Sequence, residues 1–283
     1  MTVTDLVSRR RARTAWVLGG GGNLGSVQVG MLRALADRGE VPDLVVGCSV
    51  GALNGLAMAT DPSPDGVERL RKIWLDVKGE HLFPSTKMSG PWMLLKKSLS
   101  LYPDHGIRSL IEQCAPHERI EDYPVPFECV ATNLHTGRAH WFDRGRVDQA
   151  VLASAALPAA LPPVEIDGQH YIDGAVVDNV PVSRALHHGV DRIIVLHVGN
   201  FDRPRPMPKR PIDVLLHSFS IARNFRFDED LARTPDDVEV IVIPGIDPGS
   251  MKRNDFGRTA ELIERSYAST AAFLDLRAHQ ETG

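Results

Sequence analysis

The sequence predicts an α/β protein: a single α/β/α sandwich domain with a mostly parallel central sheet. Three observations support this fold class. Short apolar runs typical of buried strands alternate with segments of helical period, a glycine-rich loop follows the first run, and the second run leads directly into a Gly-x-Ser-x-Gly turn. Strands that alternate with helices form a parallel sheet with helices on both faces. With 43% hydrophobic and 24% charged residues, the 283-residue chain has the composition of a globular protein.

The first part of the chain gives the clearest alternation. A strand at 15–18 (AWVL) stops at glycines, and apolar residues at helical spacing follow until Gly39. A second strand precedes Ser49, and an Ala-, Leu- and Met-rich helix follows it until Asp61-Pro62. In chain order the expected elements are a strand at 15–18, a helix at 26–37, a strand at 43–46 and helices at 50–60 and 67–77.

The second part continues the same pattern with shorter elements. Strands on either side of the 133–138 turn predict a hairpin, and Asp167-Gly168 predicts a second one. The expected elements are strands at 126–132 and 139–142, a helix at 147–156, a hairpin at 164–172, a strand at 192–198, a helix at 212–232, a strand at 238–243 and a helix at 259–279. Residues 81–105 mix apolar and basic residues without a clear period, and the proline-rich 201–211 predicts a loop.

Charge and cysteine content exclude several classes of protein. A net charge of −4 provides no global basic field for nucleic acid. Three scattered cysteines do not have metal-ligand spacing, and we expect neither a metal nor an organic cofactor. No apolar run is long enough to span a bilayer, and the basic residues 1–14 lack the apolar core of a secretory signal. We therefore expect a disordered basic N-terminal tail at 1–14, one domain at 15–283, and a cytoplasmic protein with peripheral membrane association as an option.

Two motifs carry the chemistry. Ser49 lies in the sequence GCSVG at 47–51, a nucleophile-elbow pattern in which a serine occupies a strained turn between a strand and a helix. Upstream, the glycine run at 19–22 offers backbone N–H groups to a developing negative charge. One motif supplies a nucleophile and the other an oxyanion hole, so together they predict acyl transfer or hydrolysis.

Two other interpretations of these motifs remain open. Gly20, Gly22 and Gly25 also match the dinucleotide-binding fingerprint, although the second strand ends without the carboxylate that would hold the ribose. A Ser-Asp-His α/β-hydrolase would need a later histidine, and His197 is a candidate. That fold normally places several strands before its elbow, whereas here a single strand precedes the strand that leads to Ser49.

Three collinear motifs resemble those of patatin-like phospholipases. They are GGGGNLG at 19–25, GCSVG at 47–51 and DGA at 173–175, and the connecting segments ATN at 131–133, ASAALP at 153–158 and DGAVVDNVP at 173–181 also match. The resemblance covers roughly residues 15–198. It implies a patatin-like hydrolase domain with a Ser–Asp dyad that cleaves carboxylic esters of phospholipids or other acyl lipids.

The resemblance also assigns roles to individual residues. It implies that Ser49 is the nucleophile, Asp173 the general base, and that the amides around Gly20, Gly21 and Gly22 form the oxyanion hole. Small residues that support the motifs are Gly25, Gly47, Gly51 and Gly174. The implied partner is a lipid substrate, presented free or at a membrane surface, and the oligomeric state is not predicted.

One departure from the family pattern keeps a non-catalytic alternative open. The family's glycine loop usually carries Arg or Lys before its last glycine, where this chain has Leu24. A catalytically idle lipid- or partner-binding protein on the same scaffold is therefore the second interpretation. Two segments with interleaved apolar and basic residues, 81–101 and 203–210, are candidates for lipid contact.

Overall fold

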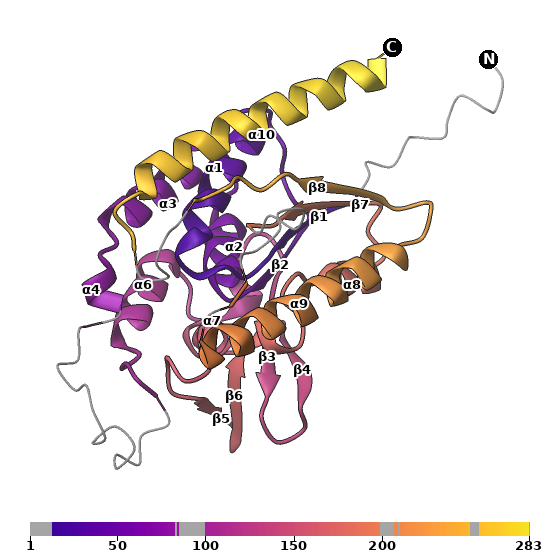
Figure 1. The fold of residues 1–283 in the computed structure, drawn as a ribbon. Coiled ribbons are helices and arrows are strands. Elements are labelled where there is room, and N and C mark those ends of the chain that lie inside the picture. Colours follow the sequence, from indigo (N-terminus) through magenta and orange to yellow (C-terminus); the bar gives the residue numbers. More distant parts are fainter. Residues whose placement is uncertain are drawn as a thin grey trace.

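The computed structural model describes residues 13–82, 84, 100–198, 207–208, 210–249 and 255–282. Its centre is an eight-stranded sheet (Figure 1). Seven strands follow the order β5-β6-β3-β2-β1-β7-β8, and β4 pairs with the edge of β3 opposite the one that β2 and β6 share. The strands are β1 (Thr14–Leu18), β2 (Leu44–Cys48), β3 (Phe127–Asn133), β4 (Arg138–Phe142), β5 (Val164–Ile166), β6 (Gln169–Asp173), β7 (Arg192–Leu196) and β8 (Glu239–Ile243). This arrangement confirms the predicted α/β fold.

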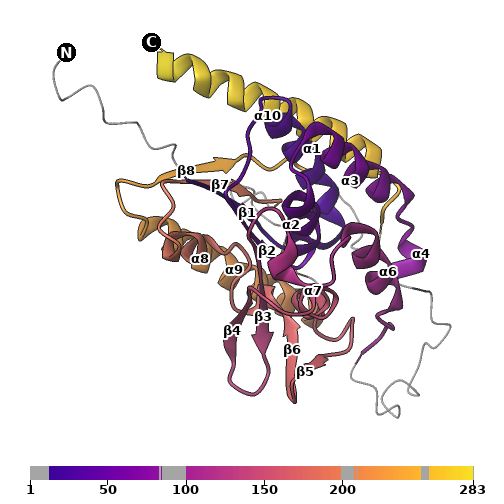
Figure 2. The same cartoon turned by 180° about the vertical axis from the view of Figure 1, so that it is seen from behind.

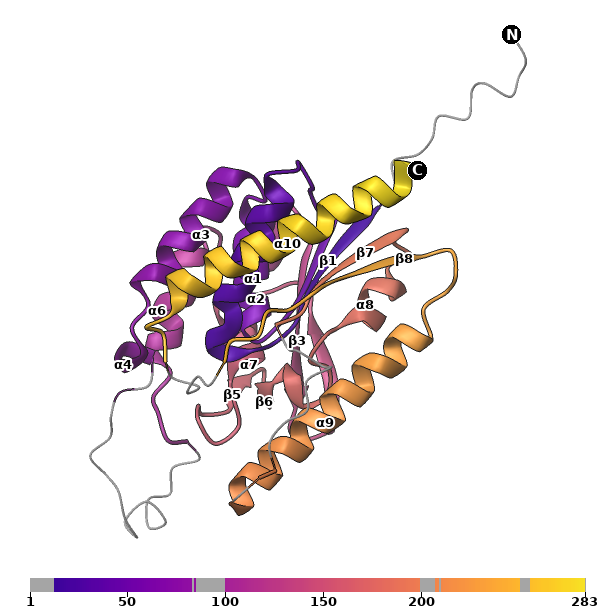
Figure 3. The same ribbon diagram turned by 45° about the horizontal axis from the view of Figure 1, so that its top comes forward.

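Helices cover both faces of this sheet. The helices are α1 (Gly25–Ala36), α2 (Val50–Thr60), α3 (Pro64–Asp76), α4 (Gly79–Leu82), α6 (His105–Cys114), α7 (Val147–Ala155), α8 (Val182–His187), α9 (Pro211–Ala232) and α10 (Thr259–Thr282). Figures 2 and 3 show α1, α2, α3 and α10 on one side of the sheet and α8 and α9 on the other. Short 3₁₀ turns complete the connections, among them η2 (Gly22–Leu24) and η4 (Gly174–Val176).

Strand β1 shows why its sequence is apolar throughout. Trp16 and Leu18 belong to the core under α1 and α2, while Ala15 and Val17 belong to a second core shared with α8 and α9. All four side chains are fully buried. A strand covered on both faces has no solvent side, so it reads as a continuous apolar run rather than an alternating one.

The strand direction within the sheet changes beside the end of β2, and this change determines where Asp173 lies. Strands β3, β2, β1, β7 and β8 run parallel, whereas β6 is antiparallel to β3. Cys48 at the end of β2 pairs with Val130, and Asp173 at the end of β6 pairs with the next residue, Ala131. Since β4 occupies the opposite edge of β3 along this stretch, β6 takes over the edge that β2 leaves. Asp173 therefore lies beside Ser49, the residue that follows β2.

A buried polar network holds the start of the glycine loop. Gln28 of α1 donates from Nε2 to the carbonyl oxygens of Gly19 and Leu196, at 2.7 and 3.0 Å. Asn54 of α2 donates to Gln28 Oε1 at 2.8 Å and accepts from Trp74 Nε1 at 2.8 Å. Because every member is buried and hydrogen-bonded, the network fixes the three helices α1, α2 and α3 and the ends of strands β1 and β7 relative to one another.

Most predicted elements have counterparts, with three additional helices and with ends shifted by a few residues; α3, for example, begins at Pro64 where the helix was predicted from residue 67. The short helices α4, α6 and α8 were not predicted; α8 has only 6 residues, too few to show a helical period. Strand β1 begins at Thr14, inside the predicted tail, because Asp43 Oδ2 accepts a hydrogen bond from the Thr14 amide at 2.8 Å. Residues 1–12 of that tail and most of the two segments considered for lipid contact lie outside the described residues. Within the described part of the chain, no helix combines the length and apolarity needed to cross a bilayer.

Candidate active site

Ser49 occupies a strained turn between β2 and α2. Its backbone has φ 55° and ψ −125°, a left-handed conformation that non-glycine residues rarely adopt. The flanking glycines make the turn possible. A Cβ on Gly47 would come within 2.6 Å of the Ala52 backbone, and one on Gly51 would overlap the Leu18 carbonyl of β1. The surrounding structure maintains such backbone strain, which is concentrated at functional sites. In a strand-to-helix turn of this kind, the strained backbone exposes the serine side chain.

Asp173 makes the closest polar contact of the Ser49 side chain. The Ser49 hydroxyl donates to Asp173 Oδ2 at 2.6 Å, across 124 residues of sequence. The other carboxylate oxygen accepts from the Ala175 amide at 2.8 Å. Asp173 is 1% exposed, whereas Ser49 is partly exposed, so the serine is open to an incoming molecule and its partner is shielded.

Several neighbours hold this pair in place, and of these the sequence singled out only Gly174. Ser154 of α7 accepts a hydrogen bond from the Ser49 amide at 3.0 Å, and Thr132 donates to the Asp173 carbonyl at 2.9 Å. Cys48 lies under the carboxylate, with Sγ 3.9 Å from Asp173 Oδ1. Gly174 allows the close approach of this loop to β3, since a Cβ there would overlap the Val130 carbonyl. Ser154 and Thr132 lie in the family-like segments, and that position was the only available signal.

Burial controls the charge of Asp173. Loss of solvent raises the pKa of Asp173 to about 6, and the hydrogen bonds from Ser49 and the Ala175 amide, together with the charge of Arg223, act in the opposite direction. The carboxylate is thus ionised at neutral pH but more basic than an exposed aspartate. A group of this kind can accept a proton from a neighbouring hydroxyl more readily than an ordinary carboxylate.

The glycine loop passes directly beside Ser49. A Cβ on Gly20 would lie 3.2 Å from the Ser49 Cβ, so a side chain at this position would crowd Ser49. The Gly20 amide donates to the Asn179 carbonyl at 3.0 Å. By contrast, the amides of Gly21 and Gly22 have no hydrogen-bond acceptor among the described residues. Of the three predicted oxyanion-hole amides, Gly20 is therefore engaged in holding the loop, and Gly21 and Gly22 are the available donors.

The remaining residues of the loop serve packing. A Cβ on Gly25 would overlap Val50 and the Trp74 ring, which explains why helix α1 begins with a glycine. Leu24, at the position where the family usually has a cation, is partly buried and packs against the apolar core. The loop itself therefore brings no positive side chain to Ser49.

His197, the candidate for a triad histidine, packs against α9. It directly follows β7, is 6% exposed, and lies edge-on to the Phe227 ring at a centroid distance of 5.6 Å. Burial lowers the pKa of His197 to about 3, with a further contribution from Arg223. The acceptor of the Ser49 hydroxyl is a carboxylate, and this imidazole stays neutral beside the sheet.

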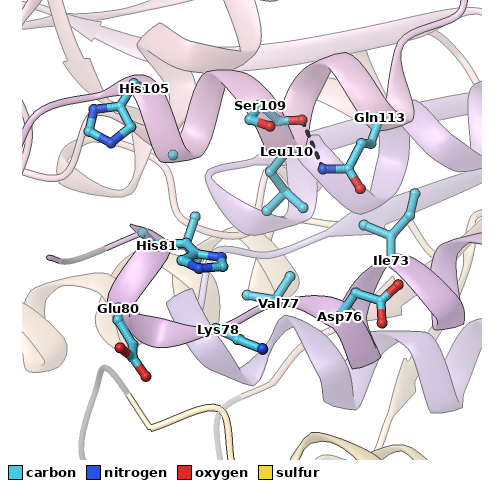
Figure 4. Close-up of a pocket in the computed structure, with 12 residues that line it drawn as sticks. Ile73, Asp76, Val77, Lys78, Glu80, His81, His105, Ser109, Leu110 and Gln113 are labelled. Atoms are coloured by element: carbon cyan, nitrogen blue, oxygen red, sulfur yellow. Dashed lines mark hydrogen bonds between the residues drawn. The ribbon is translucent and has the colours of Figure 1, made fainter.

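The cavity in Figure 4 lies away from this chemistry. It has a volume of about 430 Å³ and lies between α3, α4 and α6. Its lining includes Ile73, His81 and Leu110 but neither Ser49, Asp173 nor the glycine loop. This cavity therefore does not mark the site, and the hydrogen-bonded pair of Ser49 and Asp173 is the better indicator.

Comparison with known proteins assigns the chain to a family. The fold and the Gly-x-Ser-x-Gly turn place it among α/β proteins with a nucleophile elbow. The family model described as patatin-like phospholipase matches residues 16–186, and the chain belongs to this family. This confirms the resemblance drawn from the three motifs.

The curated relatives align with about two thirds of this chain, and the chain covers less than half of each of them. Lysophospholipase nte1 of Aspergillus terreus is 30% identical over 194 residues, which is 67% of this chain and 12% of the fungal protein. An uncharacterized NTE family protein of Mycobacterium tuberculosis is 31% identical over 187 residues, 66% of this chain and 49% of that protein. Among solved structures, VipD from Legionella pneumophila aligns with a TM-score of 0.49 at 15% identity, covering 94% of this chain and 67% of that one.

Proposed function

We propose that this protein is a serine esterase that hydrolyses carboxylic esters of acyl lipids through a Ser49–Asp173 dyad. The observation that carries the proposal is the 2.6 Å hydrogen bond from the Ser49 hydroxyl to a buried carboxylate at a strained strand-to-helix turn. Membership of a family described as patatin-like phospholipases supports the lipid ester as substrate class.

The geometry supports a two-step reaction. Ser49 Oγ attacks the acyl carbonyl carbon while its proton moves to Asp173 Oδ2, and the carbonyl oxygen takes up the negative charge. We assign the stabilisation of this oxyanion to the amides of Gly21 and Gly22 and to the positive N-terminal end of α2. Collapse of the tetrahedral intermediate breaks the ester C–O bond, and the proton on Asp173 passes to the leaving alkoxide.

Water then completes the cycle. It attacks the acyl-enzyme carbonyl, gives one proton to Asp173, and the second tetrahedral intermediate expels Ser49 as an alkoxide. Asp173 returns that proton to Ser49, and a fatty acid leaves. The base needs no histidine, because burial has already made the carboxylate basic enough to exchange protons near neutral pH.

The substrate class follows from the family and its members. The fungal relative is a lysophospholipase by name, so we propose a phospholipid, a lysophospholipid or another acyl lipid, met in solution or at a membrane surface.

The test is ester hydrolysis by matched variants. Wild type, Ser49→Ala and Asp173→Asn are assayed on a p-nitrophenyl ester series and on lysophosphatidylcholine micelles, with folding checked by circular dichroism. Asp178→Asn is the control, because Asp178 is another buried carboxyl of the same loop and its hydrogen-bond partner is Ser183 rather than Ser49. Loss of at least 10³-fold in the first two variants, with activity kept in the control, supports the dyad.

Two further variants separate the alternatives. The dyad predicts that His197→Ala keeps its activity, whereas a Ser-Asp-His triad predicts its loss. If folded wild type shows no Ser49-dependent hydrolysis and no labelling by a fluorophosphonate, the catalytic proposal is wrong and a binding role takes its place.

A further inference from the structure

Arg223 of α9 is connected to the glycine loop through one intervening side chain, that of Asn179. Its guanidinium donates from Nη1 to Asn179 Oδ1 at 3.4 Å. Asn179 in turn holds Gly20 twice, by accepting the Gly20 amide at its carbonyl and by donating from Nδ2 to the Gly20 carbonyl at 3.4 Å. Gly20 is the residue whose backbone passes beside Ser49. A chain of contacts thus joins a cation on α9 to the loop next to the nucleophile.

The surroundings make Asn179 sensitive to its partner. It is 6% exposed, and its Oδ1 lies 2.7 Å from where a Gly20 Cβ would be. A buried amide oxygen that loses its hydrogen-bond donor is left unsatisfied, which is unfavourable. Rotation of this side chain would release the Gly20 carbonyl and loosen the loop whose next amides are the proposed oxyanion donors.

We propose that Arg223 is a positioning residue for the proposed hydrolysis: it supplies from α9 the fixed positive charge of the site and, through Asn179, holds the glycine loop beside Ser49. The inference rests on the proposed function. It also accounts for the missing cation at position 24, where this chain has Leu24, because Arg223 of α9 supplies the positive charge that the loop lacks.

The charge of Arg223 acts on Asp173 and on two other buried titratable groups. It lowers the pKa of Asp173 and that of Cys48 of β2, and it helps to keep His197, after β7, neutral. The next cation along α9, Arg226, lies 2.9 Å from Asp230 and 3.5 Å from Asp178, and it acts on that pair of carboxylates instead. The Cys48 thiol stays neutral because burial raises its pKa, so Arg223 is the charged group that opposes the burial of Asp173.

The test compares Arg223→Gln, Arg223→Lys and a matched control. Arg233→Gln removes the same charge just beyond the end of α9, where Arg233 is 72% exposed and paired with Glu229. For Arg223→Gln we expect a fall in kcat of about tenfold with little change in KM, and an acid limb of kcat/KM shifted upward by about 0.5 to 1 pH unit. Arg223→Lys should restore the position of the acid limb but only part of kcat. Arg233→Gln should change neither.

A purely structural role would lower activity and thermal stability without moving the acid limb, and that result overturns the inference. A folded Arg223→Gln variant with wild-type kcat and acid limb also overturns it. The titration of the Asp173 carboxyl is followed in parallel by ¹³C NMR, with Asp173→Asn for assignment. An upward shift of that titration in Arg223→Gln supports the charge effect even if the wild type hydrolyses no ester, in which case the proposed function fails and the electrostatic part of the inference stands.

Discussion

Among single residues, Asp173 has the largest consequences for the proposed reaction. Its burial makes the carboxylate a stronger base, but it also restricts the ionised form to a higher pH range. Its pKa is raised to about 6 from an ordinary 3.8. If the ionised carboxylate is the base, activity must fall as the pH decreases through this value. We expect kcat/KM of wild type to rise about tenfold from pH 5 to pH 6.5 and then level off. Steady-state kinetics across pH 4.5–8 on a neutral ester checks this, and an acid limb centred near pH 4 would contradict it.

The same burial has a cost for stability, and the sign follows from the direction of the shift. A carboxyl whose folded pKa lies above its unfolded value binds its proton more tightly in the folded protein, so ionising it destabilises the fold. The penalty is absent below about pH 4, builds between the ordinary value of 3.8 and about 6, and is complete at pH 7. At 1.36 kcal/mol per pKa unit it amounts to about 3 kcal/mol.

Asp173→Asn should therefore stabilise the protein while abolishing activity. The amide retains an oxygen to accept from the Ala175 amide and gains a donor toward Ser49, so the local contacts survive. We expect a gain of about 2–3 kcal/mol at pH 7 and no gain at pH 4. Urea unfolding at the two pH values measures it, and a variant equally stabilised at both would show that the gain has nothing to do with ionisation.

At the scale of elements, the elbow depends on how closely α2 crosses the ends of β1 and β2. Gly51 faces the Leu18 carbonyl so closely that any Cβ must displace backbone. Gly189, in contrast, has a φ of +62° and open space around it, so a side chain there meets only the left-handed penalty of its own backbone.

We therefore expect Gly51→Ala to destabilise the fold by about 3 kcal/mol or more, and Gly189→Ala by about 1 kcal/mol. Displacement of α2 would also carry Ser49 away from Asp173, so the first variant should lose most of its hydrolytic activity even where it remains folded. Urea unfolding and ester hydrolysis on both variants decide the matter. Equal stabilities would mean that the crossing is looser than the contacts indicate.

The elements also show what sequence can reveal and what it cannot. The helix at 50–60 was predicted with the bounds of α2, because Gly-x-Ser-x-Gly and Asp61-Pro62 mark both ends. Ser49, Asp173 and the glycine loop were predicted for the site because their local motifs are specific, and the structure places the Ser49 hydroxyl 2.6 Å from Asp173. Arg223 has no such motif: a lone arginine on a long helix looks like any other, and only the packing of α9 against η4 brings it near a loop 200 residues earlier. Its role could not be predicted without the fold.

At the scale of the whole molecule, the family model matches only up to residue 186, but the central sheet and its covering helices continue beyond that residue. Strand β7 pairs with β1 and carries β8 on its other edge. Helix α10 then lies along α1, as Figure 3 shows. The contact is close: a Cβ on Gly30 would overlap the Ile263 carbonyl, and Ser266 donates to the Val27 carbonyl at 2.7 Å. Since α1 begins at the end of the glycine loop, α10 supports the site from outside the matched region.

A chain shortened to end at residue 258 should therefore lose both its stability and its site. Leu262 and Ile263 are fully buried, and their removal uncovers an apolar face on α1 that water cannot solvate favourably. We expect a shallow, non-cooperative unfolding curve and no labelling of Ser49 by a fluorophosphonate. A chain ending at residue 276 is the matched control, because it keeps the Gly30 and Ser266 contacts and ends at Leu276, which is 64% exposed. If the shorter chain unfolds cooperatively and still labels, then residues up to 258 fold as an independent unit and α10 is an accessory to it.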